Sequence, residues 1–177
     1  MHAFVDESIR AGSYRLTIVV AKPSDLAELG RAIRTAVPKG GKRTHLSAES
    51  DSRRRQILGA FGRLSISAFV YVTDYRRGDN EAPARQRCLE AMLSDMGTMQ
   101  VAIVVLDTRG PARDLEDRRT ISKSIREGSA PQGLTFAHRG SRDEFLLGLP
   151  DAIGWADGAG GRYSSLIEAV TSRVIVP

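Results

Sequence analysis

The stretch VAIVVLD, residues 101–107, decides the fold class that the sequence predicts. Its first six residues are apolar on both alternate faces, and the apolar run ends at Asp107. A strand with two apolar faces is typical of the centre of a sheet that helices cover on each side. The stretch therefore predicts an α/β protein whose central strand lies at residues 101–106.

Strand and helix patterns alternate outward from this strand. Alternating or short apolar runs predict strands at 3–5, 14–21, 64–73 and 134–137, with a hairpin turn at Gly12 and Ser13. Helical spacing predicts helices at 24–37, 49–62, 83–97, 113–127 and 163–174, and another from Ser141 that is interrupted or restarted at Pro150. The helix at 113–127 has few apolar residues and is expected on the surface.

Composition favours one globular domain over residues 1–177. The chain has 177 residues, of which 41% are hydrophobic and 27% charged, enough for a full core. No apolar run reaches the roughly 20 residues of a membrane span, and the N-terminus lacks a signal-peptide pattern. The one cysteine, Cys88, excludes an internal disulfide. We expect a cytoplasmic protein that is not a membrane protein, and no pattern sets its oligomeric state.

The charge balance favours a polyanionic partner such as nucleic acid. Lys and Arg number 26 against 21 Asp and Glu, which gives a net charge of +5. Basic side chains would neutralise backbone phosphates, without reading the base sequence. The arginine triplet 53–55 is equally well read as a solvated helix face, because consecutive helical residues point in different directions. The predicted nucleic-acid contacts are Lys39, Lys42, Arg43, His45 and Arg53.

Carboxylates stand at the ends of the apolar segments. Asp6 and Glu7 are expected after the first strand, Asp74 and Asp107 after later strands, and Asp151 at the opening of a helix. Residues just past the carboxyl ends of strands line the crevice where α/β proteins bind ligands, so several of these acids would converge there. Taken singly, each aspartate is more often a turn or helix-start residue.

Converging aspartates suit Mg²⁺ or Mn²⁺ better than zinc, because these ions prefer oxygen ligands in octahedral geometry. Two such ions about 4 Å apart can activate a water molecule and stabilise the leaving oxygen of a phosphodiester. Glycine-rich phosphate loops and a Gly-x-Ser-x-Gly nucleophile elbow are both missing from the sequence. A carboxylate metal site is therefore the chemistry that the residues favour.

The segment Ala3–Ser8 resembles the opening strand of domain-of-unknown-function family 3800, a microbial family with a ribonuclease-H-like fold. Its members begin with an apolar strand followed by Asp-Glu-Ser-Gly. Similar matches follow in order at 42–47, 104–107 and 146–153, so the resemblance spans nearly the whole chain through short motifs. It implies a ribonuclease-H-like mixed sheet flanked by helices.

The resemblance implies that Asp6, Asp107 and Asp151 are metal-binding acids and that Glu7 assists them. The chain departs from the family pattern at three positions. Ile9 stands in place of Gly, Pro150 in place of Ala, and Thr108 in place of a Glu that many members carry. The change at residue 108 removes one ligand of the family pattern.

Together these patterns predict a divalent-metal-dependent nuclease that hydrolyses phosphodiester bonds of DNA or RNA. The alternative is a catalytically inactive ribonuclease-H-like module that binds nucleic acid or protein. Two points stay open in the sequence. Either Asp151 or Asp157 could be the last acid, because Pro150 obscures the helix register, and Trp155 is expected as a core anchor with base stacking as the alternative.

Overall fold

The computed structural model describes residues 1–10, 12–36, 46–76 and 78–177. The strands are β1 (His2–Arg10), β2 (Ser13–Ala21), β3 (Ser67–Asp74), β4 (Ile103–Asp107), β5 (Thr135–Arg139) and β6 (Thr171–Ile175). The α-helices are α1 (Leu26–Ala36), α2 (Asp51–Phe61), α3 (Ala82–Asp95), α4 (Pro111–Arg126), α5 (Gly148–Ala159) and α6 (Gly161–Ser165). Four 3₁₀ turns complete the described elements: η1 (Pro23–Asp25), η2 (Leu46–Ala48), η3 (Phe145–Leu147) and η4 (Glu168–Val170).

The strands form one sheet in the order β5-β4-β1-β2-β3-β6. β2 pairs antiparallel with β1 and β3, whereas the β1–β4, β4–β5 and β3–β6 pairs are parallel. β2 is thus the one described strand that runs against the others. Gly12 has a φ of 80° beside the β1–β2 hairpin, a conformation that glycine adopts without strain. The predicted hairpin and the predicted α/β class are confirmed.

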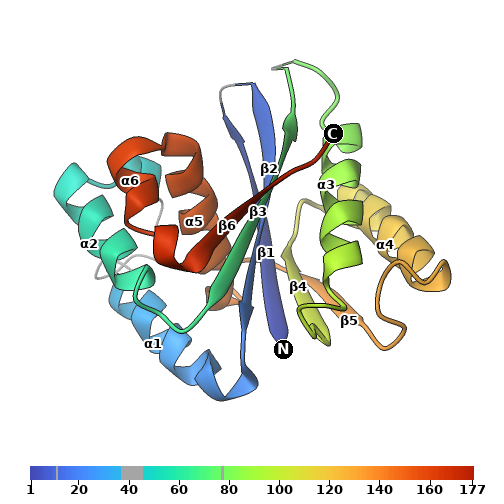
Figure 1. Cartoon of the computed structure of the whole chain (residues 1–177), viewed down its shortest axis with the longest axis horizontal. Coiled ribbons are helices and arrows are strands. Elements are labelled where there is room, and N and C mark those ends of the chain that lie inside the picture. Colours follow the sequence, from blue (N-terminus) through green and yellow to red (C-terminus); the bar gives the residue numbers. More distant parts are fainter. Residues whose placement is uncertain (11, 37–45, 77) are drawn as a thin grey trace.

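Helices cover both faces of the sheet, as Figure 1 shows, and β1 divides its side chains between them. Ala3 and Val5 point into a core with α3 and α4, whereas Phe4 points into a second core with α1, α2 and α5. This alternation follows from the period of two in a strand. Neighbouring residues of β1 therefore serve different faces, which decides the environment of Asp6 and Glu7.

The first strand is longer than its apolar residues indicate. The prediction placed its end at Val5, so that Asp6 and Glu7 would follow it. This is wrong, because β1 pairs with β2 without interruption from His2 to Arg10. The hydrogen-bonded ladder does not require apolar side chains, and both acids lie inside the strand.

The predicted C-terminal helix at 163–174 is also wrong. This region contains the short helix α6, the turn η4 and the strand β6. Leu166, Ile167 and Val170 have helical spacing, but Thr171, Val174 and Ile175 are β-branched and pair with β3. Pairing with an existing strand thus outweighed a short helical pattern.

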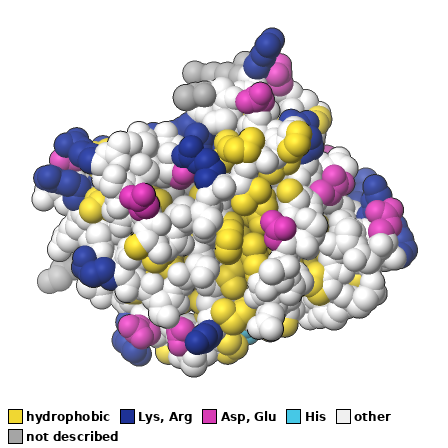
Figure 2. Space-filling model, viewed as in Figure 1, with side chains coloured by type: hydrophobic (Ala, Val, Ile, Leu, Met, Phe, Trp, Pro, Cys, Tyr) yellow, Lys and Arg dark blue, Asp and Glu magenta, His cyan; other side chains and the backbone are white. Residues whose placement is uncertain are grey.

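β6 is an edge strand, and it leaves apolar surface exposed. Figure 2 shows hydrophobic side chains gathered along the middle of the view. Compared with Figure 1, this strip has α1, α2, α5 and α6 on one side and α3 on the other. Ile175 of β6 is 72% exposed. Among the described helices, none combines the length and hydrophobicity that crossing a membrane would need.

Candidate active site

Strand pairing brings Asp6 and Asp107 together. The parallel β1–β4 register pairs Val5 with Leu106, so the next residue on each strand is an aspartate. Leu106 points into the α3–α4 core, and therefore Asp107 points to the α5 face, as Asp6 does. Neighbouring strands lie about 4.8 Å apart, which makes the two carboxylates lateral neighbours on one face.

Helix α5 carries Asp151 in its first turn and lies directly on this face. Gly154 lets it approach closely: a Cβ there would lie 2.6 Å from Thr17 Oγ1 and 3.3 Å from Ser8 Oγ. Pro150 falls in the first turn of α5, where proline is compatible with a helix, so α5 is continuous from Gly148. The close packing at Gly154 positions Asp151 over β1.

The three carboxylates interact electrostatically. Asp6 is 7% exposed, and Asp107 and Asp151 are half-buried. Burial, followed by the charges of Asp151, Glu7 and Asp107, raises the pKa of Asp6 to about 8. Like charges that cannot be hydrated favour the protonated form. The α5 face thus concentrates negative charge at the carboxyl end of β4.

Glu7 lies on the opposite face of β1. Its carboxylate accepts from Arg85 Nη1 at 2.9 Å and lies 3.1 Å from Arg109 Nε. Burial raises the pKa of Glu7, and the charges of Arg85 and Arg109 oppose that rise. Glu7 therefore belongs to an ion network under α3 and α4 rather than to the face that carries Asp6.

A second set of buried charges continues this network. Arg85 donates through Nε and Nη2 to both oxygens of Asp117, at 2.7 and 2.6 Å. His138 Nε2 lies 3.1 Å from Asp117 Oδ2. Although burial opposes ionisation, the bonds from Arg85 and His138 lower the pKa of Asp117 to about 2. His138 lies within β5, which extends two residues beyond the predicted strand at 134–137.

Helix α4 lies on the surface, as predicted, with most of its residues exposed, and the few side chains that it buries include two acids. Leu115 is 46% exposed, whereas Asp114 and Asp117 are buried. Asp114 accepts from Thr108 Oγ1 at 2.6 Å and from the Arg109 amide at 2.9 Å. Thr108 therefore anchors the turn after Asp107 to α4.

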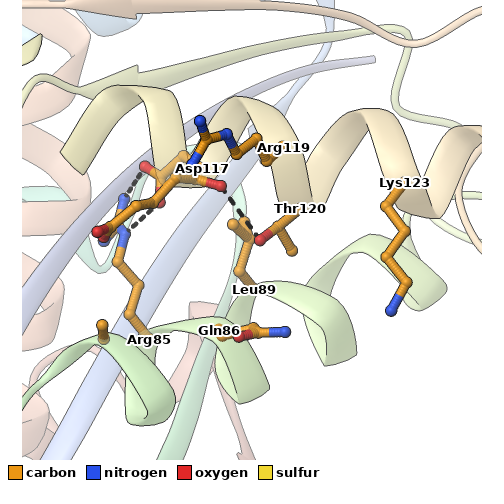
Figure 3. Close-up of a pocket in the computed structure, with 9 residues that line it drawn as sticks. Arg85, Gln86, Leu89, Asp117, Arg119, Thr120 and Lys123 are labelled. Atoms are coloured by element: carbon orange, nitrogen blue, oxygen red, sulfur yellow. Dashed lines mark hydrogen bonds and ion pairs between the residues drawn. The ribbon is translucent and has the colours of Figure 1, made fainter. Parts of the chain in front are cut away.

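A cavity of about 390 Å³ lies between α3 and α4, above the Arg85–Asp117 pair. Figure 3 shows Arg85, Gln86 and Leu89 on α3 facing Asp117, Thr120 and Lys123 on α4. The cavity lies on the face opposite to Asp6. Its floor is a satisfied ion pair, so the acids of the α5 face and this cavity are separate features.

The predicted contacts Lys39, Lys42, Arg43 and His45 lie outside the described residues. Arg53 is described, and its guanidinium donates to Gln56 Oε1 at 2.7 Å and to the Ala36 carbonyl at 2.9 Å. It therefore binds the end of α1. These bonds account for Arg53 structurally, and its proposed contact with nucleic acid stays a prediction.

The structure distinguishes the remaining aspartates. Asp157 is bound by Arg15 at 3.0 Å and by Arg173 at 2.6 Å, so Asp151 is the α5 acid that acts on Asp6. Asp74 is exposed and pairs with Ser13 on β2, whereas Asp6 pairs with Thr17. Four residues along a strand span about 13 Å, which places Asp74 away from the other acids.

Trp155 is half-buried and packs partly against the core of the α5 face. Its ring meets Tyr163 edge-on at 5.1 Å between centroids, and the guanidinium carbons of Arg10 and Arg54 lie 5.0 and 5.1 Å from its centroid. These contacts agree with its prediction as an anchor that ties α5 to α2, α6 and β1.

Sequence reasoning missed Arg85, Arg109 and Arg139. Arg85 is only 4% exposed, although the residues around it in the sequence give no sign that it is buried. Arg139 is exposed and pairs in register with Asp107. Parallel pairing of β4 with β5 was the signal that would have placed Arg139 beside the acids.

Within residues 1–10, 12–36, 46–76 and 78–177, no three His, Cys, Asp or Glu side chains are arranged to hold a metal ion by themselves. The acids of the α5 face are thus grouped electrostatically rather than closed into a protein-only coordination shell.

No family model matches the chain, and no curated protein matches it. Among solved structures, the PCNA:RNase HII complex from Archaeoglobus fulgidus contains a similar chain. The match has a TM-score of 0.55 and 14% sequence identity, and it covers 90% of this chain and 72% of the other. At this identity the likeness shows the fold, so the predicted ribonuclease-H-like fold is confirmed.

Proposed function

We propose that the chain is a divalent-metal-dependent nuclease that hydrolyses phosphodiester bonds of DNA or RNA. The observation that carries this proposal is the group formed by Asp6, Asp107 and Asp151 on the α5 face, where burial, followed by the charges of neighbouring carboxylates, raises the pKa of Asp6 to about 8. A divalent cation would relieve this repulsion. The resemblance to family 3800 and the net charge of +5 support the same proposal.

The donor set fits Mg²⁺ or Mn²⁺, because carboxylate oxygens are the protein ligands that these ions prefer. Mg²⁺ is commonly bound by one or two carboxylates with water and substrate phosphate, rather than by a complete protein cage. Asp6 and Asp107 would hold the ion from adjacent strands, and Asp151 would hold it from α5. When bound, the ion would activate water and stabilise the leaving oxygen of the phosphodiester.

The residues of this chain would contribute position and charge. The β1–β4 register holds Asp6 beside Asp107, and Gly154 holds α5 close enough for Asp151 to complete the group. On the other face, Glu7 of β1 forms an ion pair with Arg109, which lies in the turn after β4. This ion pair joins the two segments just past Val5 and Leu106, where the β1–β4 pairing ends. We propose that Lys39, Lys42, Arg43 and His45 contact the substrate backbone.

The second candidate function is a nucleic-acid-binding or protein-binding module without turnover. Thr108 favours it, because this residue binds Asp114 where many members of family 3800 carry an acid. A binding module would retain salt-sensitive association with nucleic acid and would show no metal-dependent cleavage.

The test is cleavage of labelled single- and double-stranded DNA and RNA with Mg²⁺ or Mn²⁺. Asp107→Asn, which preserves size and removes the charge, is expected to lower the rate by at least about 100-fold, since it removes a group that acts on the reacting centre. The matched control is Asp79→Asn, because Asp79 is an exposed aspartate in the β3–α3 loop. No metal-dependent cleavage by the wild-type chain would contradict the nuclease and favour the binding module.

A further inference from the structure

On the face that carries the acids, the described helices leave part of the sheet uncovered. Helix α5 contacts β1, β2 and β3, whereas β4 on that face is contacted by the short turn η3. Ile103 of β4 is 37% exposed, although Val19 and Val70 are fully buried on the same face of β2 and β3. We call this surface the open face, and it is formed by Ile103, Val105, Thr135, Ala137 and Arg139.

The open face corrects the prediction that helices cover the central strand on both sides. On the α3–α4 side, Val104 and Leu106 are fully buried. On the α5 side, Ile103 is exposed and Val105 is half-buried. Apolar surface thus starts at the exposed Ile103 and continues through the half-buried Val105 along β4 toward Asp107.

Arg139 supplies the positive charge of this face. It pairs with Asp107 across the parallel β4–β5 ladder, so the two residues lie on adjacent strands. Its neighbour His138 points to Asp117 under α4, and therefore Arg139 points to the opposite, open face. Within the described part of the chain, its guanidinium forms no ion pair.

We propose that the open face is the track on which the nucleic-acid backbone lies, and that Arg139 binds the phosphate beside the one held at the acids. This inference rests on the proposed function and deepens it, because it names the side of approach and a phosphate-binding residue. A guanidinium binds phosphate through two parallel N–H donors. The apolar side chains of β4 and β5 would contact sugars and bases.

The charges on this face favour a nucleic-acid backbone over a small anion. In the absence of a cation the acids of the α5 face do not attract a phosphate, whereas Arg139 attracts one directly. Because Asp107 and Arg139 lie on adjacent strands, a divalent ion at the acids would bind one phosphate of a backbone and Arg139 would bind the next. A small anion would need only the divalent ion or only Arg139.

The experiment measures binding separately from cleavage. Arg139→Gln and Arg139→Lys are made in the Asp107→Asn chain, and fluorescence anisotropy gives the Kd for labelled DNA and RNA over a range of salt concentrations. The matched control is Arg118→Gln, because Arg118 is an exposed arginine of α4, which lies against the opposite face. Thermal melting checks that each variant folds.

Arg139→Gln is expected to raise Kd about 5- to 10-fold at low salt and to reduce the slope of log K against log salt by about one. Arg139→Lys should keep that slope, and Arg118→Gln should match its parent. Equal Kd and slope in Arg139→Gln and Arg118→Gln would overturn the proposal.

Three further outcomes separate the inference from the proposed function. Metal-dependent cleavage that Asp107→Asn abolishes and Arg139→Gln leaves unchanged contradicts the inference alone. Absence of binding to every nucleic acid overturns both. A dimer in light scattering that Ile103→Glu converts to a monomer would assign the open face to a second copy of this chain and overturn the track.

Discussion

Asp6 and Glu7 are adjacent acids in one strand, yet the two faces of the sheet treat them in opposite ways. On the α3–α4 face, Glu7 and Asp117 share the guanidinium of Arg85. On the α5 face, burial raises the pKa of Asp6, and the charges of two other aspartates raise it further. The first arrangement places two carboxylates beside one buried guanidinium, and the second places carboxylates near one another. We propose that the acids of the α3–α4 face serve the structure and that those of the α5 face form the site.

Removing the Arg85 guanidinium, which Glu7 and Asp117 share, is expected to have the largest effect on the free energy of unfolding. Arg85→Ala removes the buried guanidinium that Glu7 and Asp117 share, and leaves Glu7 with Arg109 alone and Asp117 with His138 alone. Breaking a buried pair in this way costs about 3–5 kcal/mol. We expect urea denaturation to report a loss of this size. Arg119→Ala, an exposed change on α4, should stay within about 0.5 kcal/mol of wild type; similar losses in both would contradict the role of Arg85.

Changing Asp6 should have the opposite effect on stability. The pKa of Asp6 is about 8 in the folded chain against an ordinary 3.8, so the folded state binds the extra proton between these values. Stability contributed by this proton is present at low pH and is lost as the pH rises through about 8. Each pKa unit corresponds to roughly 1.4 kcal/mol, so the loss amounts to a few kcal/mol.

Asp6→Asn is therefore expected to be more stable than wild type at pH 9 and to show a flatter dependence of unfolding free energy on pH. Mn²⁺ should raise the melting temperature of the wild type at pH 9 and have little effect on Asp6→Asn, because the ion replaces the missing proton. A wild-type chain that gains stability from pH 5 to pH 9 in proportion to Asp6 ionisation would refute the grouping.

Two aspartates of α5 sharpen the comparison further. Asp157 binds Arg15 and Arg173, whereas Asp151 acts on Asp6. Asp157→Asn is expected to cost about 1–2 kcal/mol, through weakened charge-assisted hydrogen bonds, and to keep cleavage. Asp151→Asn is expected to keep stability and lose cleavage. The reverse pattern, measured by melting and by the nuclease assay, would make Asp157 the last acid.

The sequence was sufficient to predict the α/β class, most strands and the acids on the α5 face. Asp107 was recognisable because an apolar run ends there, and parallel pairing then places it beside Asp6. The separation of Asp6 from Glu7 was missed, because Ser8 and Arg10 gave no apolar signal that β1 continues. With β1 extended, the period of two would have assigned the two acids to opposite faces.

The charges of the α3–α4 face could not be read from the sequence. Asp117 and Arg85 look like surface residues of charged helices. Their burial depends on contact between these two side chains, which are 32 positions apart in the sequence. Burying a charge is costly unless a partner meets it, and no local pattern shows that partner. β6 was missed for a related reason, since its strand character comes from pairing with β3.

The most direct test of the central claim, that the acids of the α5 face form a divalent-cation site, is calorimetric titration with Mn²⁺ alone at pH 8.5. The variants are Asp6→Asn, Asp107→Asn and, as the control from the other face, Glu81→Gln, whose parent residue pairs with Arg109 and Arg113. We predict that the first two bind Mn²⁺ at least about 10-fold more weakly than wild type, since each removes a charged ligand, and that Glu81→Gln binds as wild type does. Equal binding by all four chains, or no binding by the wild type, would contradict the account.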